Sequence, residues 1–310
     1  MGKNNIDLNK KKVFAARFSI ISNATLVGLK FFIGIITSSV SIIAEAIHSG
    51  IDLVAAIIAN YSVRKSVQPP DDSHKFGHGK VENISALIEG MLILFAAYLI
   101  LHEAYEKIVR PVLLNVLGVG IGIMLISTVS NYYISKYLFK VSKETDSAAL
   151  EADAWHLRTD VYTSLGVFIG LFLINFVPIK GIGILDPIVA ILTALLIIKA
   201  GYNISKDAIL NLADIKLPQE QENLIKTAIE ENSEKFVTFH NLRTRRAGPY
   251  KYIDLHLVVS KDLHVDKAHK LTHHLTADIR NKLKNTDVMI HLEPCDSKCE
   301  ICKLECSKHQ

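Results

Sequence analysis

Residues 44–53 read AEAIHSGIDL, and residues 153–164 read DAWHLRTDVYTS. Both stretches lie in long apolar segments, and each places an aspartate four residues after a histidine: His48 and Asp52, then His156 and Asp160. Side chains four residues apart lie on one face of a helix. Two such faces that meet offer two imidazole nitrogens and two carboxylates, a suitable tetrahedral shell for Zn²⁺.

Carboxylates are costly to bury in a membrane unless a cation neutralises them. Interhelical hydrogen bonds or a proton relay would explain a lone His and Asp equally well. Because the same pair occurs in two separate apolar segments, the pattern favours metal binding. We therefore predict that His48, Asp52, His156 and Asp160 hold an ion within the membrane.

The apolar residues are concentrated in one part of the chain. Of the 310 residues, 49% are hydrophobic and 21% charged, and the mean hydropathy is +0.26. Apolar runs dominate residues 13–212, whereas the sequence from Pro218 onward is typical of soluble protein. A helix needs about 20 apolar residues to cross a bilayer, and the candidate spans are 13–37, 40–63, 81–107, 113–138, 148–176 and 184–210.

Basic residues indicate the orientation of these six spans. We interpret residues 1–12 as a cytoplasmic segment and the first span as a retained helix, since polar residues interrupt it and no clean cleavage site follows. Lysines and arginines gather in the N-terminal segment and in the 64–80 and 139–147 loops. By the positive-inside rule, both termini face the cytoplasm and the protein lies in the plasma or inner membrane as a multi-pass protein.

The soluble part predicts a small α/β domain over residues 213–294. Helical spacing at 218–232 and 264–284 alternates with strand patterns at 235–246, 250–259 and 287–293, and Pro218 suits a first helical position. The order αββαβ indicates an open-faced sandwich of the metallochaperone or ferredoxin-like kind. The fold class is therefore an all-α transmembrane domain of six helices followed by a cytosolic α/β domain. No nucleotide-binding loop and no catalytic Ser or Cys with a partner is visible, so we expect neither an enzyme nor a nucleotide or nucleic-acid partner.

Further metal-competent residues lie outside the spans. Asp71, His74 and His78 in the 64–80 loop combine a carboxylate with histidines four residues apart, although a solvated basic loop would look similar. Residues 295–310 form a Cys-rich tail that suits metal capture, a disordered tail or, on spacing alone, an iron–sulfur cluster. Its cysteines are Cys295, Cys299, Cys302 and Cys306.

Together these stretches resemble the cation diffusion facilitator family, in particular its bacterial zinc/proton antiporters, over residues 13–294. The resemblance rests on four stretches: AEAIHSGIDL, HKFGHGKVE at 74–82, DAWHLRTDVYTS, and HNLRTRRAGPYKYIDLHL at 240–257. The resemblance implies a homodimer, a transported ion at the two His–Asp pairs, a second ion at the loop residues, and a salt bridge between Lys80 and Asp214. It also implies a cytosolic zinc site, which pattern alone could not establish, at His240, His256, His269, His291 and Glu293.

The sequence thus predicts a secondary active transporter that exports a divalent cation, Zn²⁺ first, in exchange for protons. Fe²⁺, Cd²⁺, Co²⁺, Ni²⁺ and Mn²⁺ remain alternative substrates because similar ligand shells bind them. A membrane metal sensor or buffer that does not transport is the alternative class. The role of the Cys-rich tail and the proton stoichiometry stay open.

Overall fold

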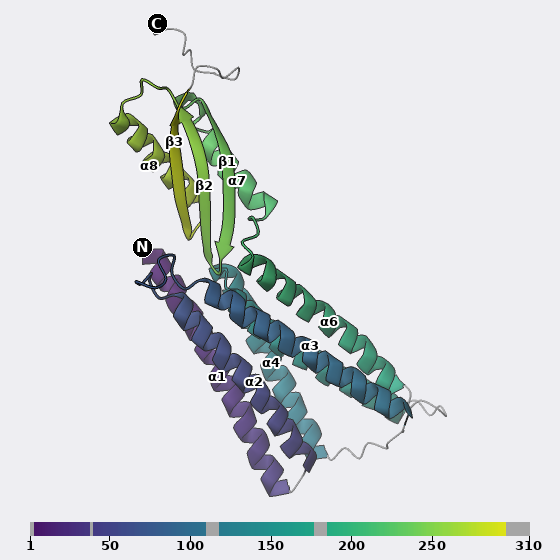
Figure 1. The fold of residues 1–310 in the computed structure, drawn as a ribbon. Coiled ribbons are helices and arrows are strands. Elements are labelled where there is room, and N and C mark those ends of the chain that lie inside the picture. Colours follow the sequence, from purple (N-terminus) through teal and green to yellow (C-terminus); the bar gives the residue numbers. More distant parts are fainter. Residues whose placement is uncertain (1–2, 38–39, 110–117, 177–184, 296–310) are drawn as a thin grey trace. The chain divides into compact units, whose positions relative to one another are not determined.

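The structure is a computed structural model that describes residues 3–37, 40–109, 118–176 and 185–295. It divides the chain into two compact units, Met1–Ile209 and Leu210–Gln310. Long helices form the first unit, and a small sheet with two helices forms the second (Figure 1). The two units are described separately.

Six long helices make up the first unit within the described ranges, and each corresponds to one predicted span. Several continue past the apolar stretch: the first begins ten residues before residue 13, because Lys and Leu near its start are good helix formers in water. On length and apolar composition alone, three described segments could cross a membrane: Asp7–Ile36, Lys80–Glu106 and Pro187–Leu212. The helices are α1 Lys3–Thr37, α2 Val40–Ser66, α3 Lys80–Val109, α4 Gly118–Thr145, α5 Ala148–Phe176 and α6 Leu185–Leu212.

Small residues bring four of these helices close together. Ala15 and Ala16 of α1, Ala149 and Ala154 of α5, and Val63 of α2 are fully buried in one apolar core that also includes residues of α4. Small side chains let helix backbones approach in a membrane, where the hydrophobic effect does not drive association. This close approach positions the ionisable residues of α2 and α5.

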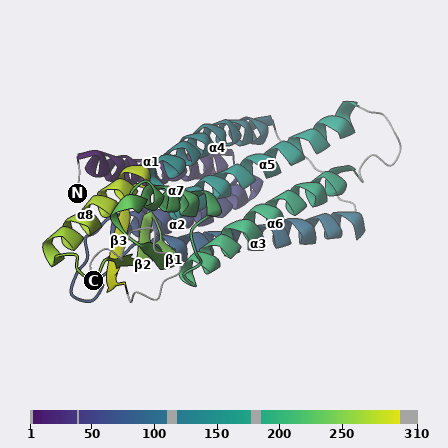
Figure 2. The same ribbon diagram turned by 90° about the horizontal axis from the view of Figure 1, so that it is seen from above.

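The remaining two long helices, α3 and α6, run side by side (Figures 1 and 2). Ile93 and Ala97 of α3 pack with Ile197 of α6. A Cβ added to Gly90 would clash with Ser205 Oγ and lie 3.1 Å from the Ser205 backbone nitrogen. The spacing of α3 and α6 therefore depends on glycine at position 90.

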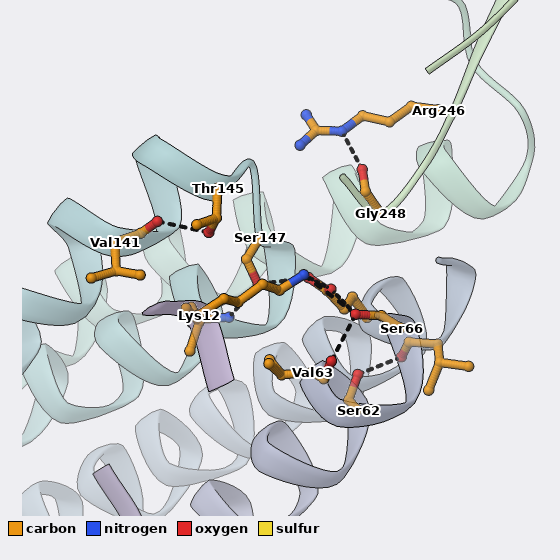
Figure 3. A network of polar contacts seen from close by, with 12 residues as sticks. Lys12, Ser62, Val63, Ser66, Val141, Thr145, Ser147, Arg246 and Gly248 are labelled. Carbon is orange, nitrogen blue, oxygen red and sulfur yellow. Dashed lines mark hydrogen bonds and ion pairs between the residues drawn. The ribbon is translucent and has the colours of Figure 1, made fainter. Parts of the chain in front are cut away.

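A buried ion pair ties one end of the helical unit together. Lys12 Nζ of α1 contacts the Glu82 carboxylate of α3, and both side chains are at most 1% exposed. Ser66 of α2 donates to Glu82 Oε1, and Ser147, just before α5, donates to Oε2 over 2.6 Å. Figure 3 shows Lys12, Ser66 and Ser147 converging on this point. A single carboxylate thus joins four helices.

The second unit contains a three-stranded sheet covered by two helices, which confirms the predicted αββαβ order. The strands are ordered β1-β2-β3, with β1 and β2 antiparallel and β2 and β3 parallel. A short 3₁₀ helix, Ser233–Lys235, overlaps the first residue of the strand predicted at 235–246, which begins later, at Thr238. Pro218 precedes its helix rather than opening it. The elements are α7 Gln219–Glu230, β1 Thr238–Ala247, β2 Tyr250–Val259, α8 Val265–Lys282 and β3 Thr286–Pro294.

One face of the sheet forms the core of this unit. Ile253, Leu255 and Leu257 of β2 are at most 1% exposed, and they pack with apolar residues of α7 and α8. Side chains alternate between the two faces of a strand, so His256 lies on the face away from this core. Three histidines of the predicted cytosolic site lie on the strands that form this face: His240, His256 and His291.

The Lys12–Glu82 pair predicts a large stability effect. Glu82→Ala leaves Lys12 buried without its carboxylate, and we expect a loss of about 3–5 kcal/mol in the free energy of unfolding. Glu144→Ala is the matched control, since the Lys11–Glu144 pair is 39% and 35% exposed and solvent screening leaves such a surface pair with little effect on stability. Denaturant titration of the purified chain in detergent measures both. Equal losses in the two variants would contradict the assigned role of the pair.

The α3–α6 contact gives a second prediction. Gly90→Ala should lower the free energy of unfolding by about 1–3 kcal/mol, because the added methyl group meets backbone atoms of α6. Gly28→Ala is its control, since a Cβ there meets nothing within 4 Å. The same titration tests this, and an undiminished stability of Gly90→Ala would show that the two helices can separate freely.

Candidate functional site

A buried cluster of ionisable groups lies between α2 and α5. One ligand atom each from Asp52, His156 and Asp160 lies within 4.8 Å of the others. His156 Nε2 is 3.0 Å from Asp52 Oδ1, and these two residues are 5% and 8% exposed. The structure thus brings together residues that are more than one hundred positions apart, in a geometry suited to a cation.

His48 completes the predicted set of four, but its side chain lies outside the described part of the structure. Its backbone belongs to α2, one turn before Asp52. The geometry of this candidate site therefore rests on three of the four predicted residues.

An asparagine joins this cluster that the sequence analysis did not single out. Asn131 of α4 donates from Nδ2 to Asp160 Oδ2 over 3.5 Å. Its own Oδ1 is buried without a hydrogen-bond partner among the described residues, as is His156 Nδ1. An amide in an apolar span was the available signal, but only the packing of α4 on α5 shows which ligand it contacts.

The loop between α2 and α3 folds around Asp71. Asp71 Oδ1 accepts backbone N–H groups from Ser73 over 3.0 Å and from His74 over 2.7 Å. The His74 backbone N–H is the largest cause that holds the pKa of the Asp71 carboxyl below its usual range. This carboxylate therefore stays ionised, and so available to a cation, at neutral pH.

Both predicted loop histidines meet this carboxylate. His74 Nδ1 and His78 Nε2 each lie 3.1 Å from an Asp71 oxygen, and the two rings are 4.5 Å apart. His78 is 3% exposed, and neither of its ring nitrogens has a hydrogen bond of acceptable geometry. Gly77 turns the chain between them with φ +80°, a conformation that favours glycine. The turn thus presents three ligand groups to one point.

The open face of the sheet brings three histidines into line. His240 of β1 lies opposite His256 of β2, which lies opposite His291 of β3. Glu293 sits among them: its carboxylate is 2.7 Å from His256 Nδ1, 3.3 Å from His240 Nε2 and 3.8 Å from His291 Nε2. A bulge in β1 directly follows His240, and bulges commonly re-aim side chains near sites.

Other predicted residues lie elsewhere. His269 lies on α8, where its ring meets His273 with centroids 4.4 Å apart, and it does not join the His240–His256–Glu293 group. Cys295 is 5% exposed, packs with Val237 and Val258, and extends the pairing of β3 through its backbone. This packing accounts for the placement of the first tail cysteine, and metal binding by Cys295 stays a prediction. The remaining tail cysteines, Cys299, Cys302 and Cys306, fall outside the described residues.

The predicted salt bridge joins residues of different units. Lys80 opens α3, while Asp214 follows α6 with φ +58° and lies 3.5 Å from Arg245 Nη1. Their pairing stays a prediction, because each unit is described by itself.

Two family models cover nearly the whole described chain. The cation efflux transmembrane domain matches residues 16–213, and the cytoplasmic domain of cation efflux proteins matches residues 217–295. The boundary between the two matches falls at the change from the helical unit to the α/β unit.

Two related transporters agree with these matches. An uncharacterised transporter from Synechocystis is 32% identical over 91% of this chain and 90% of its own length. The cation-efflux pump FieF of Salmonella schwarzengrund is 30% identical over 88% of this chain and 89% of its own length. The metal-bound C-terminal domain of the CzcD transporter from Thermotoga maritima is 24% identical, covers 25% of this chain and 94% of its own, and has a TM-score of 0.24. The chain is an integral membrane transporter that belongs to the cation efflux, or cation diffusion facilitator, family.

Proposed function

We propose that this protein exports Zn²⁺ from the cytoplasm in exchange for protons. The observation that carries the proposal is the buried Asp52–His156–Asp160 cluster in the helical unit of a cation efflux protein. Two carboxylates inside such a unit require a neutralising charge, and a cation in transit supplies it.

The ligand chemistry supports zinc among the divalent ions. With His48, the site offers two imidazoles and two carboxylates, and Zn²⁺ accepts four such ligands in tetrahedral geometry. Hard cations such as Mg²⁺ prefer oxygen ligands alone. The mixed set therefore favours a first-row transition metal, with zinc first because it has no preference for square-planar or octahedral geometry.

Proton exchange follows from competition for the same atoms. Imidazole nitrogens and carboxylates must lose their protons before they bind a metal ion. In the proposed cycle, the site loads its cation while open to the cytoplasm, the helices rock, and protons displace the cation on the far side. The protonated site then returns, so that the proton gradient drives export.

The cytosolic unit would regulate this cycle in a homodimer. Zinc bound at His240, His256 and Glu293 would favour one arrangement of the two soluble domains and so bias transport. The loop cluster at Asp71, His74 and His78 would hold a further ion. We place the protein in the plasma or inner membrane with both termini in the cytoplasm, where Lys80 and Asp214 would pair near the dimer interface.

Substitution at the transport cluster is the first test of the proposal. Asp160→Asn removes one anionic ligand while keeping the shape of the side chain, so zinc flux should fall about 10–100-fold. The measurement is zinc uptake into proteoliposomes with an imposed pH gradient. Asp7→Asn, an exposed change on α1, is the control and should keep the flux of the unaltered protein.

Wild-type flux in Asp160→Asn would remove this cluster from the transport path. The same assay with Fe²⁺, Cd²⁺, Co²⁺, Ni²⁺ and Mn²⁺ as competitors identifies the preferred ion. Dependence of the rate on the imposed pH gradient tests the exchange with protons.

Regulation by the cytosolic cluster gives a separate prediction. His256→Ala combined with His291→Ala should raise the zinc concentration for half-maximal flux about tenfold or more. The flux at saturating zinc should stay close to that of the unaltered protein. His274→Ala on the exposed face of α8 controls for loss of any surface histidine. An unchanged concentration dependence would mean that this cluster does not regulate transport.

A further inference from the structure

Two buried carboxylates of the helical unit belong to none of the three candidate metal clusters. Glu89 of α3 is 0% exposed, and Asp153 of α5 is 1% exposed. Their charges repel each other, and both interact electrostatically with the imidazole of His156. The pair therefore lies beside the transport cluster without being part of it.

The position of the pair along the helices points toward the cytosolic end. Glu89 follows Glu82 by seven residues, about two helical turns, and Asp153 precedes His156 by three. The cytoplasmic domain follows α6, so with each helix crossing once, α3 and α5 both begin on the cytosolic side. The carboxylates lie between that end and Asp52, His156 and Asp160.

Each carboxylate has one buried oxygen without a hydrogen bond of acceptable geometry among the described residues. Glu89 Oε1 accepts one hydrogen bond, from Ser85 Oγ over 3.2 Å. Glu89 Oε2 and Asp153 Oδ2 have no hydrogen bond of acceptable geometry to any described residue. An ion that is buried without a partner costs several kcal/mol, so the ionised form of this pair is favoured when a cation lies beside it.

A buried hydroxyl group on a third helix lies near this pair of carboxylates. Ser19 of α1 is 0% exposed, its Oγ has no hydrogen bond of acceptable geometry among the described residues, and it lies beside the Asp153 carboxyl group. With it, α1, α3 and α5 each contribute an oxygen. Carboxylate and hydroxyl oxygens bind divalent cations, and a set without nitrogen holds a transition metal less tightly than one with imidazole.

We propose that Glu89, Asp153 and Ser19 form a transit station, a second intramembrane site that holds the divalent cation before it reaches Asp52, His156 and Asp160. The station rests on the proposed transport function, since it lies on the path that function requires. Passage along several sites demands binding that is favourable enough for entry but weak enough for release. The oxygen-only station followed by a cluster with imidazole provides this order.

The charge of the station can be separated from its shape. Glu89→Gln keeps the volume and removes the charge, whereas Glu89→Asp keeps the charge and shortens the side chain. A cation station predicts that zinc flux in proteoliposomes falls about tenfold or more in Glu89→Gln and is largely kept in Glu89→Asp. A packing role predicts the opposite order and would overturn the proposal. Asp153→Asn and Asp153→Glu repeat the comparison, and Glu103→Gln, exposed on the same helix, is the control.

Equilibrium binding tests the station without any transport. In a full-length variant that carries Asp52→Asn, Asp160→Asn, His78→Ala and His256→Ala, zinc dialysis should still detect a weak site that Glu89→Gln abolishes. Binding that is the same with and without Glu89→Gln would overturn the station. If the unaltered protein shows no zinc flux while this weak site is present, the proposed transport function fails and the station stands as a binding site.

Discussion

Charge inside the helical unit has to be neutralised, and most of the arrangement of the helices follows from this constraint. In a low-dielectric interior an unpaired ion costs several kcal/mol, so an ion must find a partner or lose its charge. Lys12 and Glu82 meet the requirement within the protein, and the hydroxyls of Ser66 and Ser147 satisfy the remaining acceptors. Glu89 and Asp153 each keep one buried oxygen without a hydrogen bond of acceptable geometry among the described residues. We therefore interpret Lys12 and Glu82 as a structural ion pair, and Glu89 and Asp153 as part of the proposed site for a transported cation.

The contrast extends to the polar groups around the transport cluster. Asn131 supports Asp160 with one amide hydrogen, while its carbonyl oxygen stays unpaired and buried. A site that was fully satisfied without metal would bind a cation only after breaking its own hydrogen bonds. A partly satisfied cluster, with His156 bound to Asp52 on one nitrogen alone, keeps that cost low, and it holds the helices near the geometry that an ion needs.

Residue spacing in the sequence predicted the features that depend only on residues within one helix or one strand. The His–Asp spacing predicted one face each of α2 and α5, and the strand pattern at 250–259 predicted β2 with its bounds. Contacts between elements were not predictable in the same way. Nothing in the spacing relates His240 to His256 and His291, because strand register comes from the whole sheet. The proximity of Glu89 and Asp153 was not predictable either, because the two residues lie in separate spans. The placement of Cys295 in an apolar cluster depends on where β3 ends.

The line of histidines across the sheet also ties metal binding to folding. Each of the three strands contributes one ring, and side chains alternate between faces, so a slip of one residue would turn Leu257 or Leu292 outward in place of a histidine. Only the native pairing assembles the ligands. A bound ion would therefore stabilise one register over its neighbours by mass action, and the last strand, which pairs in parallel after a long helical connection, would gain most from such selection.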